Sequence, residues 1–133
     1  MNLVVARFRD GRLVKGQTND FLPNKDAFHL LPEEAAPGSK AMEVRVAELK
    51  ALFFVKALKG DSVHAETNRF DPFKPTPPGR KLRVVFADGE ELIGTTQGYQ
   101  PDRPGFFLVP ADARSNNERC FVVKASTRSV EPA

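Results

Sequence analysis

The sequence predicts an all-β protein made of two tandem small barrels that are related by internal duplication. The prediction rests on an ungapped internal repeat and on short apolar runs separated by turn residues. A chain of 133 residues fits one ordinary domain or two very small ones. Because 41% of the residues are hydrophobic, each half can contribute to a packed core.

The repeat aligns Leu3–Pro32 with Lys81–Pro110 at an offset of 78 residues. Nine of the 30 positions are identical, whereas ordinary composition gives about two by chance. The identical pairs are Phe8/Phe86, Asp10/Asp88, Gly11/Gly89, Gly16/Gly94, Thr18/Thr96, Pro23/Pro101, Phe28/Phe106, Leu30/Leu108 and Pro32/Pro110. Most of these residues are typical of turns, bends or cores, so the repeat indicates a duplicated fold.

Each repeat opens with two apolar runs joined by an Asp-Gly pair, at 10–11 and at 88–89. Asp-Gly is a strong signal for a tight hairpin turn in which both central residues have positive φ. Gly16 and Gly94 follow inside the second strand. An isolated glycine in a strand indicates a bulge or a sharp bend, which a small barrel needs to curl its strand.

The rest of each repeat predicts a third strand, a loop, a fourth strand, a single turn and a fifth strand. In the first repeat the third strand, fourth strand, turn and fifth strand are expected at 28–30, 44–46, 47–50 and 51–55. In the second repeat the same elements are expected at 106–108, 121–123, 124–126 and 127–130. The segments after the loop align at an offset near 77. A single amphipathic helix over Glu43–Lys56 is the alternative. Its β-branched and aromatic residues favour strands.

This strand order matches SH3-like and Sm-like barrels. The predicted organisation is a first barrel over residues 1–56, a Pro-rich linker over 57–80 and a second barrel over 81–133. Phe70 and Phe73 are expected to hold the linker against a barrel surface. The alternative is a Pro-rich docking motif for a partner domain.

Charge and cysteine content restrict the cellular setting. The net charge of +3 permits polyanion binding, but acidic residues are interspersed throughout and no basic face is indicated. Cys120 is the single cysteine and lies in a strand-like run, so we expect a buried thiol and a reducing compartment. Met1–Phe8 is too short an apolar run for a signal peptide, and the sequence predicts a cytoplasmic protein.

No pattern in the sequence indicates catalysis, a metal or a cofactor. Neither His29 nor His64 has metal-binding residues at ligand spacing, and His29 is expected to pack within the fold. Nucleophile-elbow, phosphate-loop and dinucleotide motifs are missing. The sequence therefore predicts a non-enzymatic protein without cofactors.

Two repeated loops, Asn19–Lys25 and Gln97–Gly105, are the candidate binding elements. Each combines an aromatic ring, a proline, a small polar residue and a cation; the candidate residues are Phe21, Asn24, Lys25, Tyr99, Asp102 and Arg103. An exposed ring can stack on a base or an aromatic ligand while a cation meets phosphate. Tyr99 is the stronger candidate because its hydroxyl suits a half-exposed site. In the alternative, the two rings close the barrel ends and the cations are solvated.

Gly16, Phe21 and Asn24 partly match the first sequence motif of Sm proteins, although Asp20 precedes the aromatic residue and the Arg-Gly of the second motif is missing. The repeated pattern Asp-Gly, Gly-x-Thr, Phe/Tyr-x-Pro-Asn/Asp-Lys/Arg and Phe-x-Leu-x-Pro also resembles an uncharacterised bacterial family with a duplicated SH3-like or Sm-like unit. Domains of that family sometimes accompany PilZ or other signalling domains. The resemblance implies a bacterial signalling context.

Together these features predict a non-enzymatic binding or adaptor module that recognises a protein partner through barrel loops or a strand edge. The alternative function is weak RNA or nucleotide binding of the Sm type. It would use the aromatic residues Phe21 and Tyr99 and the cations Lys25 and Arg103.

Overall fold

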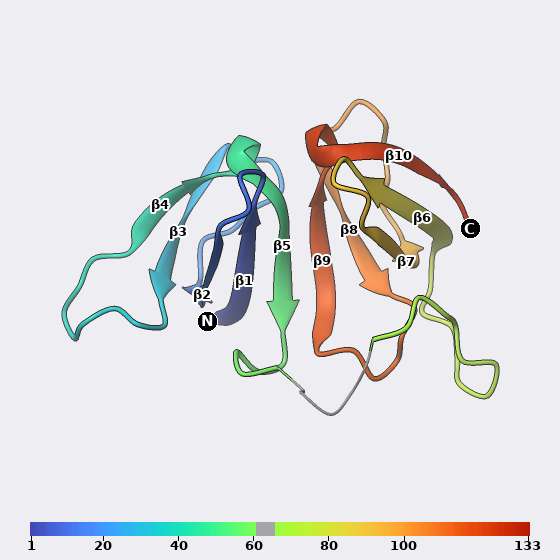
Figure 1. Ribbon diagram of the computed structural model, residues 1–133, viewed down its shortest axis with the longest axis horizontal. Helices are drawn as coiled ribbons and strands as arrows, with labels where there is room; N and C mark the ends of the chain where they lie inside the picture. Colours follow the sequence, from blue (N-terminus) through green and yellow to red (C-terminus); the bar gives the residue numbers. More distant parts are fainter. Residues whose placement is uncertain (61–65) are drawn as a thin grey trace.

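The computed structural model describes residues 1–60 and 66–133 and shows an all-β protein (Figure 1). Its described part contains ten strands, two 3-10 turns and no α-helix. The elements are β1 (Asn2–Phe8), β2 (Leu13–Thr18), β3 (Ala27–Pro32), β4 (Met42–Arg45), η1 (Val46–Glu48), β5 (Leu49–Val55), β6 (Arg80–Phe86), β7 (Glu91–Thr96), β8 (Gly105–Pro110), β9 (Asn117–Val123), η2 (Lys124–Ser126) and β10 (Thr127–Pro132). The predicted strand–turn–strand series is confirmed, and the helix over Glu43–Lys56 is excluded.

The ten strands form one open antiparallel sheet in the order β10-β6-β7-β8-β9-β5-β1-β2-β3-β4. The first five strands make one half of the molecule and the last five make the other, side by side in Figure 1. The halves meet where β5 pairs with β9, from Ala51 opposite Val122 to Val55 opposite Asn117. Strands β4 and β10 are the two outer edges of the sheet.

The strand pairings of the first half recur in the second half at a constant offset of 78 residues. Val4 pairs with Phe54, and Leu82 pairs with Pro132. The registers of β1 with β2 and of β3 with β4 recur in the same way in β6 with β7 and in β8 with β9. The offset near 77 expected for the last segments is therefore wrong, and the paired regions 2–54 and 80–132 correspond without insertion.

The first hairpin turn explains why Asp-Gly is repeated. The Gly11 amide donates to the Phe8 carbonyl at 3.1 Å, and the Phe8 amide donates to the Arg12 carbonyl at 2.9 Å. Gly11 has a φ of 97°, whereas no non-glycine residue in the described part has a positive φ. The predicted turn with two positive φ angles is thus wrong. The loop has three residues ending in a left-handed glycine, and Asp10 contributes a carboxylate that accepts the Arg12 amide at 2.9 Å.

Gly16 and Gly94 are required by the close approach of a neighbouring strand. A Cβ at Gly16 would lie 2.2 Å from the Leu31 carbonyl oxygen, and one at Gly94 would lie 2.1 Å from that of Val109. The register of β1 with β2 and of β6 with β7 is continuous through both glycines. The expected bulge is therefore wrong at these positions, and the glycines let β3 and β8 come close.

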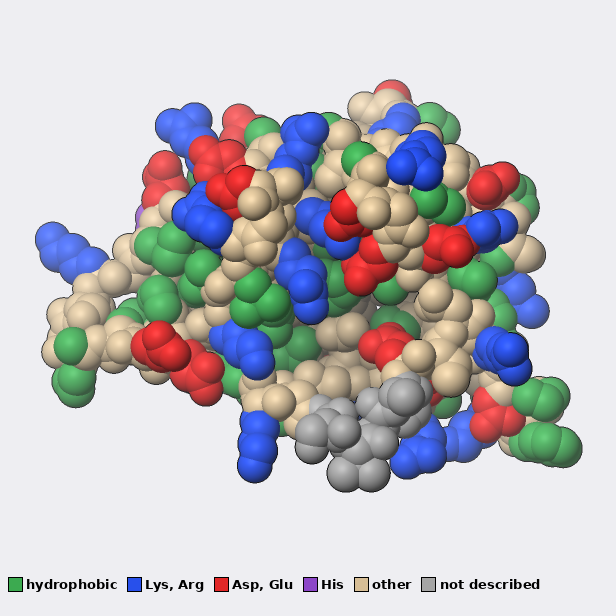
Figure 2. All heavy atoms as spheres, viewed as in Figure 1, with side chains coloured by type: hydrophobic (Ala, Val, Ile, Leu, Met, Phe, Trp, Pro, Cys, Tyr) green, Lys and Arg blue, Asp and Glu red, His purple; other side chains and the backbone are tan. Residues whose placement is uncertain are grey.

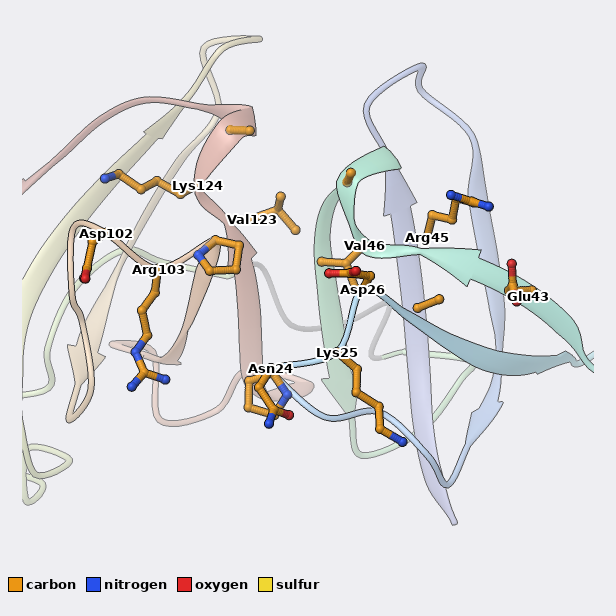
Figure 3. Close-up of a pocket in the computed structure, with 15 residues that line it drawn as sticks. Asn24, Lys25, Asp26, Glu43, Arg45, Val46, Asp102, Arg103, Val123 and Lys124 are labelled. Atoms are coloured by element: carbon orange, nitrogen blue, oxygen red, sulfur yellow. The ribbon is translucent and has the colours of Figure 1, made fainter.

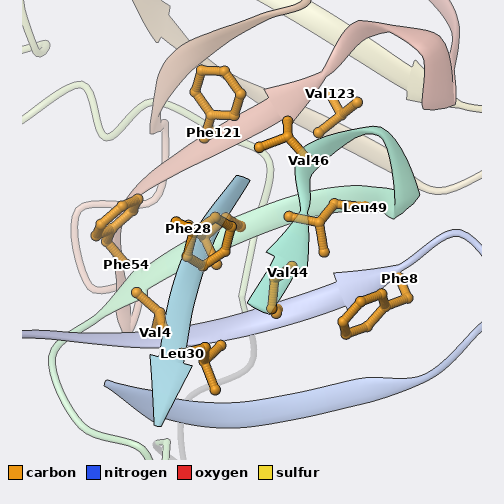
Figure 4. Close-up of a cluster of buried hydrophobic side chains, with 12 residues drawn as sticks. Val4, Phe8, Phe28, Leu30, Val44, Val46, Leu49, Phe54, Phe121 and Val123 are labelled. Atoms are coloured by element: carbon orange, nitrogen blue, oxygen red, sulfur yellow. The ribbon is translucent and has the colours of Figure 1, made fainter. Parts of the chain in front are cut away.

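Two hydrophobic clusters form the core, and β5 and β9 contribute to both. The first cluster contains Leu49, Leu52, Phe54, Phe121 and Val123 from these strands, with Val4, Ala6, Phe8, Phe28, Leu30, Val44 and Val46 (Figure 4). The second contains Val5, Ala51, Phe53, Val55, Cys120 and Val122, with Leu82, Val84, Phe86, Phe106 and Leu108. Since each cluster takes residues from both halves, neither half completes its core alone.

The linker contacts the second half at some points and is exposed at others. The Asn68 side chain donates to the Glu91 carbonyl at 3.0 Å. Phe70 is half-buried, with the Lys81 ammonium 4.7 Å from its ring centre. Phe73, by contrast, is 94% exposed. The expectation that both rings hold the linker is therefore wrong for Phe73.

We predict that Gly94→Ala lowers the free energy of unfolding by about 1–3 kcal/mol, because its methyl group collides with backbone that cannot move aside cheaply. Gly98→Ala is the matched control, since no atom lies within 4 Å of its Cβ position. Urea denaturation of both variants measures the difference. Equal stability of the two variants would contradict the close approach of β7 and β8.

Candidate functional site

A cleft of about 900 Å³ lies between the two halves, at the end of the sheet that carries η1 and η2. The β2–β3 loop and η1 border it from the first half, and the β7–β8 loop and η2 border it from the second (Figure 3). These segments occupy corresponding places in the two halves. The cleft is thus lined by the repeated loops that the sequence singles out.

Both loops contain the same β-turn, at residues 22–25 and 100–103. In each turn the amide of the fourth residue donates to the carbonyl of the first at 3.1 Å. Pro23 and Pro101 occupy the second position, where a fixed φ near −65° favours this turn. Turn geometry therefore accounts for the repeated proline and the small polar residue after it, and places a cation at the end of each turn.

Backbone hydrogen bonds attach each loop to the neighbouring 3-10 turn. The Val46 amide donates to the Asp26 carbonyl at 2.9 Å, and the Lys124 amide donates to the Pro104 carbonyl at the same distance. The Lys124 ammonium also donates to the Pro101 carbonyl. Loop and turn therefore form one connected wall on each side of the cleft.

Phe21 points into the core. Its ring makes edge contacts with Phe28, Phe54, Phe107 and Phe121, at centroid distances of 5.1–6.1 Å. Two of these rings belong to each half, so Phe21 joins the halves through the first hydrophobic cluster. The Phe21 ring is therefore packed against the core and does not offer an open stacking face.

Tyr99 occupies the corresponding position in the second half and is half-buried. Its ring packs edge-on against Phe106 at 4.8 Å, and the Arg80 guanidinium lies 5.5 Å from its centre. Tyr99 does not line the cleft. Neither aromatic ring of the two loops therefore lines the cleft. The polar and charged candidate residues of the loops do line it, namely Asn24, Lys25, Asp102 and Arg103.

The cleft combines an apolar floor with charges of both signs. Val46 and Val123 approach each other across it and are only 8% and 2% exposed (Figure 3). Alanines and prolines extend this apolar surface, namely Pro23, Ala27, Ala47, Pro104 and Ala125. The cations are Lys25, Arg45, Arg103 and Lys124, and the anions are Asp26, Glu43 and Asp102.

Sequence reasoning missed the contribution of the two 3-10 turns. Residues 47–50 and 124–126 were predicted only as single turns between strands, yet Val46 and Ala47 of η1 and Lys124 and Ala125 of η2 line the cleft. A signal was available, because both turns occupy corresponding places in the repeat. The pairing that sets them opposite each other is long-range and leaves no local pattern.

Three titratable residues outside the cleft, His29, Asp20 and Cys120, have contacts or burial that indicate structural roles. His29 is exposed, and its Nδ1 lies 2.7 Å from the Asp20 carboxylate, so the expectation that it packs in the core is wrong. The His29 amide and then its ring lower the pKa of Asp20. Cys120 is 1% exposed, as predicted, and burial raises the pKa of its thiol.

Within residues 1–60 and 66–133, no group of three or more His, Cys, Asp or Glu side chains is placed to hold a metal ion. His64 lies outside the described residues. In the same ranges, no helix is long and apolar enough to cross a membrane.

A family of unknown function, DUF6982, matches residues 1–132 of the sequence. The chain belongs to this family. It matches no curated protein and no solved structure. The repeated loops and the cleft are accordingly the observations from which a function must be argued.

An ion-pair cluster joins the halves near the two hairpin turns. The Lys50 ammonium, whose side chain is only 12% exposed, lies 2.7 Å from an Asp88 oxygen and 2.8 Å from a Glu90 oxygen. It also lies 4.7 Å from the Phe86 ring centre. Burial acts to lower the pKa of Lys50, but its bonds to both carboxylates outweigh this effect and raise it. The Lys50 bond, followed by the Glu90 amide, lowers the pKa of Asp88.

We predict that Lys50→Met lowers the free energy of unfolding by about 0.5–1 kcal/mol at neutral pH, since a partly exposed ion pair is lost. A lowered Asp88 pKa stabilises the fold above the unfolded value of about 3.9, and a raised Lys50 pKa stabilises it below about 10.4. The difference from the wild type should therefore shrink as the pH falls through the folded pKa of Asp88 or rises through that of Lys50.

Urea denaturation between pH 3 and pH 11 measures this window, with Lys56→Met as the control because the Lys56 side chain is exposed. A Lys50→Met difference that stays constant across the whole range would rule out the ion-pair cluster as its source.

Proposed function

We propose that this protein is a non-enzymatic binding or adaptor module that holds a segment of a protein partner in the cleft between its halves. The observation that carries the proposal is the cleft of about 900 Å³, with its floor of buried valines and its surrounding charges of both signs. An apolar centre within a polar rim is the usual arrangement of a protein-binding surface.

The form of the cleft favours an extended peptide as the occupant. The floor formed by Val46 and Val123 suits a small or branched apolar side chain as an anchor. Four cations and three carboxylates around it can pair with charged residues on either side of that anchor. Backbone bonds hold the walls in place, which reduces the entropy lost when a partner binds.

RNA or nucleotide binding is the second candidate, and the cations Lys25, Arg45, Arg103 and Lys124 are the observation in its favour. Stacking on bases needs open aromatic faces, whereas Phe21 packs among four other rings. Figure 2 shows basic and acidic side chains interspersed over the face it presents. A peptide partner therefore fits the site better.

The proposal extends to the origin of the cleft and to its setting. We infer that the halves are copies of one SH3-like or Sm-like barrel unit, over residues 1–56 and 81–133, joined by the linker 57–80. The constant offset of 78 in strand pairing and in identical residues supports this inference. The resemblance to bacterial domains that accompany PilZ and other signalling domains favours a regulatory role in the bacterial cytoplasm.

We predict that selection from a random 12-residue peptide display library yields binders that depend on the cleft. Ala125→Arg should weaken their binding by about tenfold or more, because the new side chain fills the space above the floor. Ala125 is exposed, so the substitution should leave the melting temperature unchanged. Isothermal titration calorimetry with a selected peptide measures the affinity.

Ala36→Arg is the matched control, because Ala36 is exposed in the β3–β4 loop and does not line the cleft. Equal binding to both variants would contradict the proposal. Titration of a labelled 12-nucleotide single-stranded RNA at low salt tests the second candidate. Cleft-dependent, salt-sensitive RNA binding without any peptide binder would replace the first candidate with the second.

A further inference from the structure

A second concavity of about 480 Å³ adjoins the cleft and shares Pro23 and Arg103 with it. We propose that this concavity is a binding site for a small planar aromatic anion, separate from the peptide cleft. The proposal rests on three features of the lining: a half-buried aromatic ring, cations with no Asp or Glu among the described lining residues, and a buried hydroxyl with no hydrogen-bond partner in the described part of the chain.

The lining is apolar and includes one partly accessible ring. Phe107 is half-buried and Val109 is exposed, whereas Phe106 and Phe121 also line the concavity but are only 3% and 1% exposed. Phe107 and Phe121 meet edge to face at a centroid distance of 5.2 Å, so their orientation is fixed by mutual packing. Aromatic side chains recognise planar rings by stacked or edge contacts, which aliphatic ligands cannot make equally well.

The charge of the lining is entirely positive. Arg103 and Arg119 both contribute to it, and no Asp or Glu is among the lining residues that the structure describes. The Arg119 guanidinium lies 4.4 Å from the Phe54 ring centre and 4.5 Å from that of Phe107. Stacking on these two rings holds the guanidinium in place while leaving its N–H groups at the ring edges able to donate. A carboxylate or phosphate is the group that such donors bind.

Thr95 supplies the third feature. It lines the concavity, is 0% exposed, and its Oγ1 has no hydrogen-bond partner among the described residues. The neighbouring Thr96 is also buried, but its hydroxyl donates to the Phe107 carbonyl at 2.8 Å. A buried hydroxyl without a partner destabilises the fold unless another molecule satisfies it. A polar atom on the bound ligand would do so.

The size and charge of the concavity define the ligand class. A volume near 480 Å³ falls within the range of small-molecule sites. The Phe107 ring favours a planar aromatic body, and the two arginines favour an anionic group on it. The class therefore comprises aromatic carboxylates and aromatic phosphates, and the two can be separated by direct comparison.

The test is a titration of ¹⁵N-labelled protein with 2-naphthoate and with 2-naphthyl phosphate, followed by amide chemical shifts. The expected result is saturable shifts of the Gly98, Gly105 and Val109 amides, with one anion binding more tightly than the other. Neutral 2-naphthalenemethanol and non-aromatic cyclohexanecarboxylate should each bind about tenfold more weakly or worse. No saturable shift at these amides, or equal affinity for the neutral compound, would overturn the proposal.

Two substitutions separate ligand binding from a structural role. Thr95→Val should raise the melting temperature by about 2–5 °C, because an unsatisfied hydroxyl is removed, and should weaken anion binding by about three- to tenfold. Arg119→Met should weaken anion binding by about tenfold, and Met retains an unbranched stem beside Phe54 and Phe107.

Thr96→Val is the matched control. It should lower the melting temperature, because its hydroxyl has a partner, and should leave the affinity unchanged. A fall in melting temperature for Thr95→Val, or equal losses of affinity in Thr95→Val and Thr96→Val, would contradict the assignment. Since Arg119 and Thr95 do not line the peptide cleft, these outcomes are independent of the peptide proposal.

Discussion

The pairing of β5 with β9 is the interaction on which the rest of this molecule depends. It joins the halves into one sheet and places both strands between two hydrophobic clusters, with every residue of β5 except Lys50 buried and the last four residues of β9 buried. Leu52 and Phe54 face one cluster while Ala51 and Phe53 face the other. The same pairing sets η1 and η2 on either side of a gap, so the cleft follows from the way the halves are joined.

Much of the fold could be predicted from the sequence because its signals are local and occur twice. The Asp-Gly turns, the strand periodicity and the strand–turn–strand series each occur in both repeats, so the prediction for one repeat supported the prediction for the other. The details that failed depend on tertiary contacts. The sequence offers a bulge as one explanation of Gly16, but the structure shows a continuous register and a close approach to Leu31 on the next strand. Phe73 was expected to hold the linker against a barrel surface, but its side chain is almost fully exposed.

The candidate site was predicted in part for the same reason. Lys25 and Arg103 reach the cleft because turn chemistry places them at the ends of equivalent loops. The accompanying rings could not be located from the sequence, since an aromatic residue at a loop is equally compatible with a binding face and with a core. Phe21 packs against the core because rings from both halves contact it. These contacts require that the two halves are already packed together.

The two outer strands of the sheet, β4 and β10, have features that oppose the same kind of strand pairing between molecules. β10 and β4 hold the places in their halves that β5 and β9 hold at the centre, so the same head-to-tail contact between molecules would generate a filament or a ring. Where β5 has Phe53 and Phe54, however, β10 has Glu131 and Pro132. A charge and a missing amide donor oppose strand addition, and β4 is only four residues long. The features of β10 and β4 therefore disfavour strand addition at the outer edges, whereas the apolar strands β5 and β9 pair with each other within the molecule.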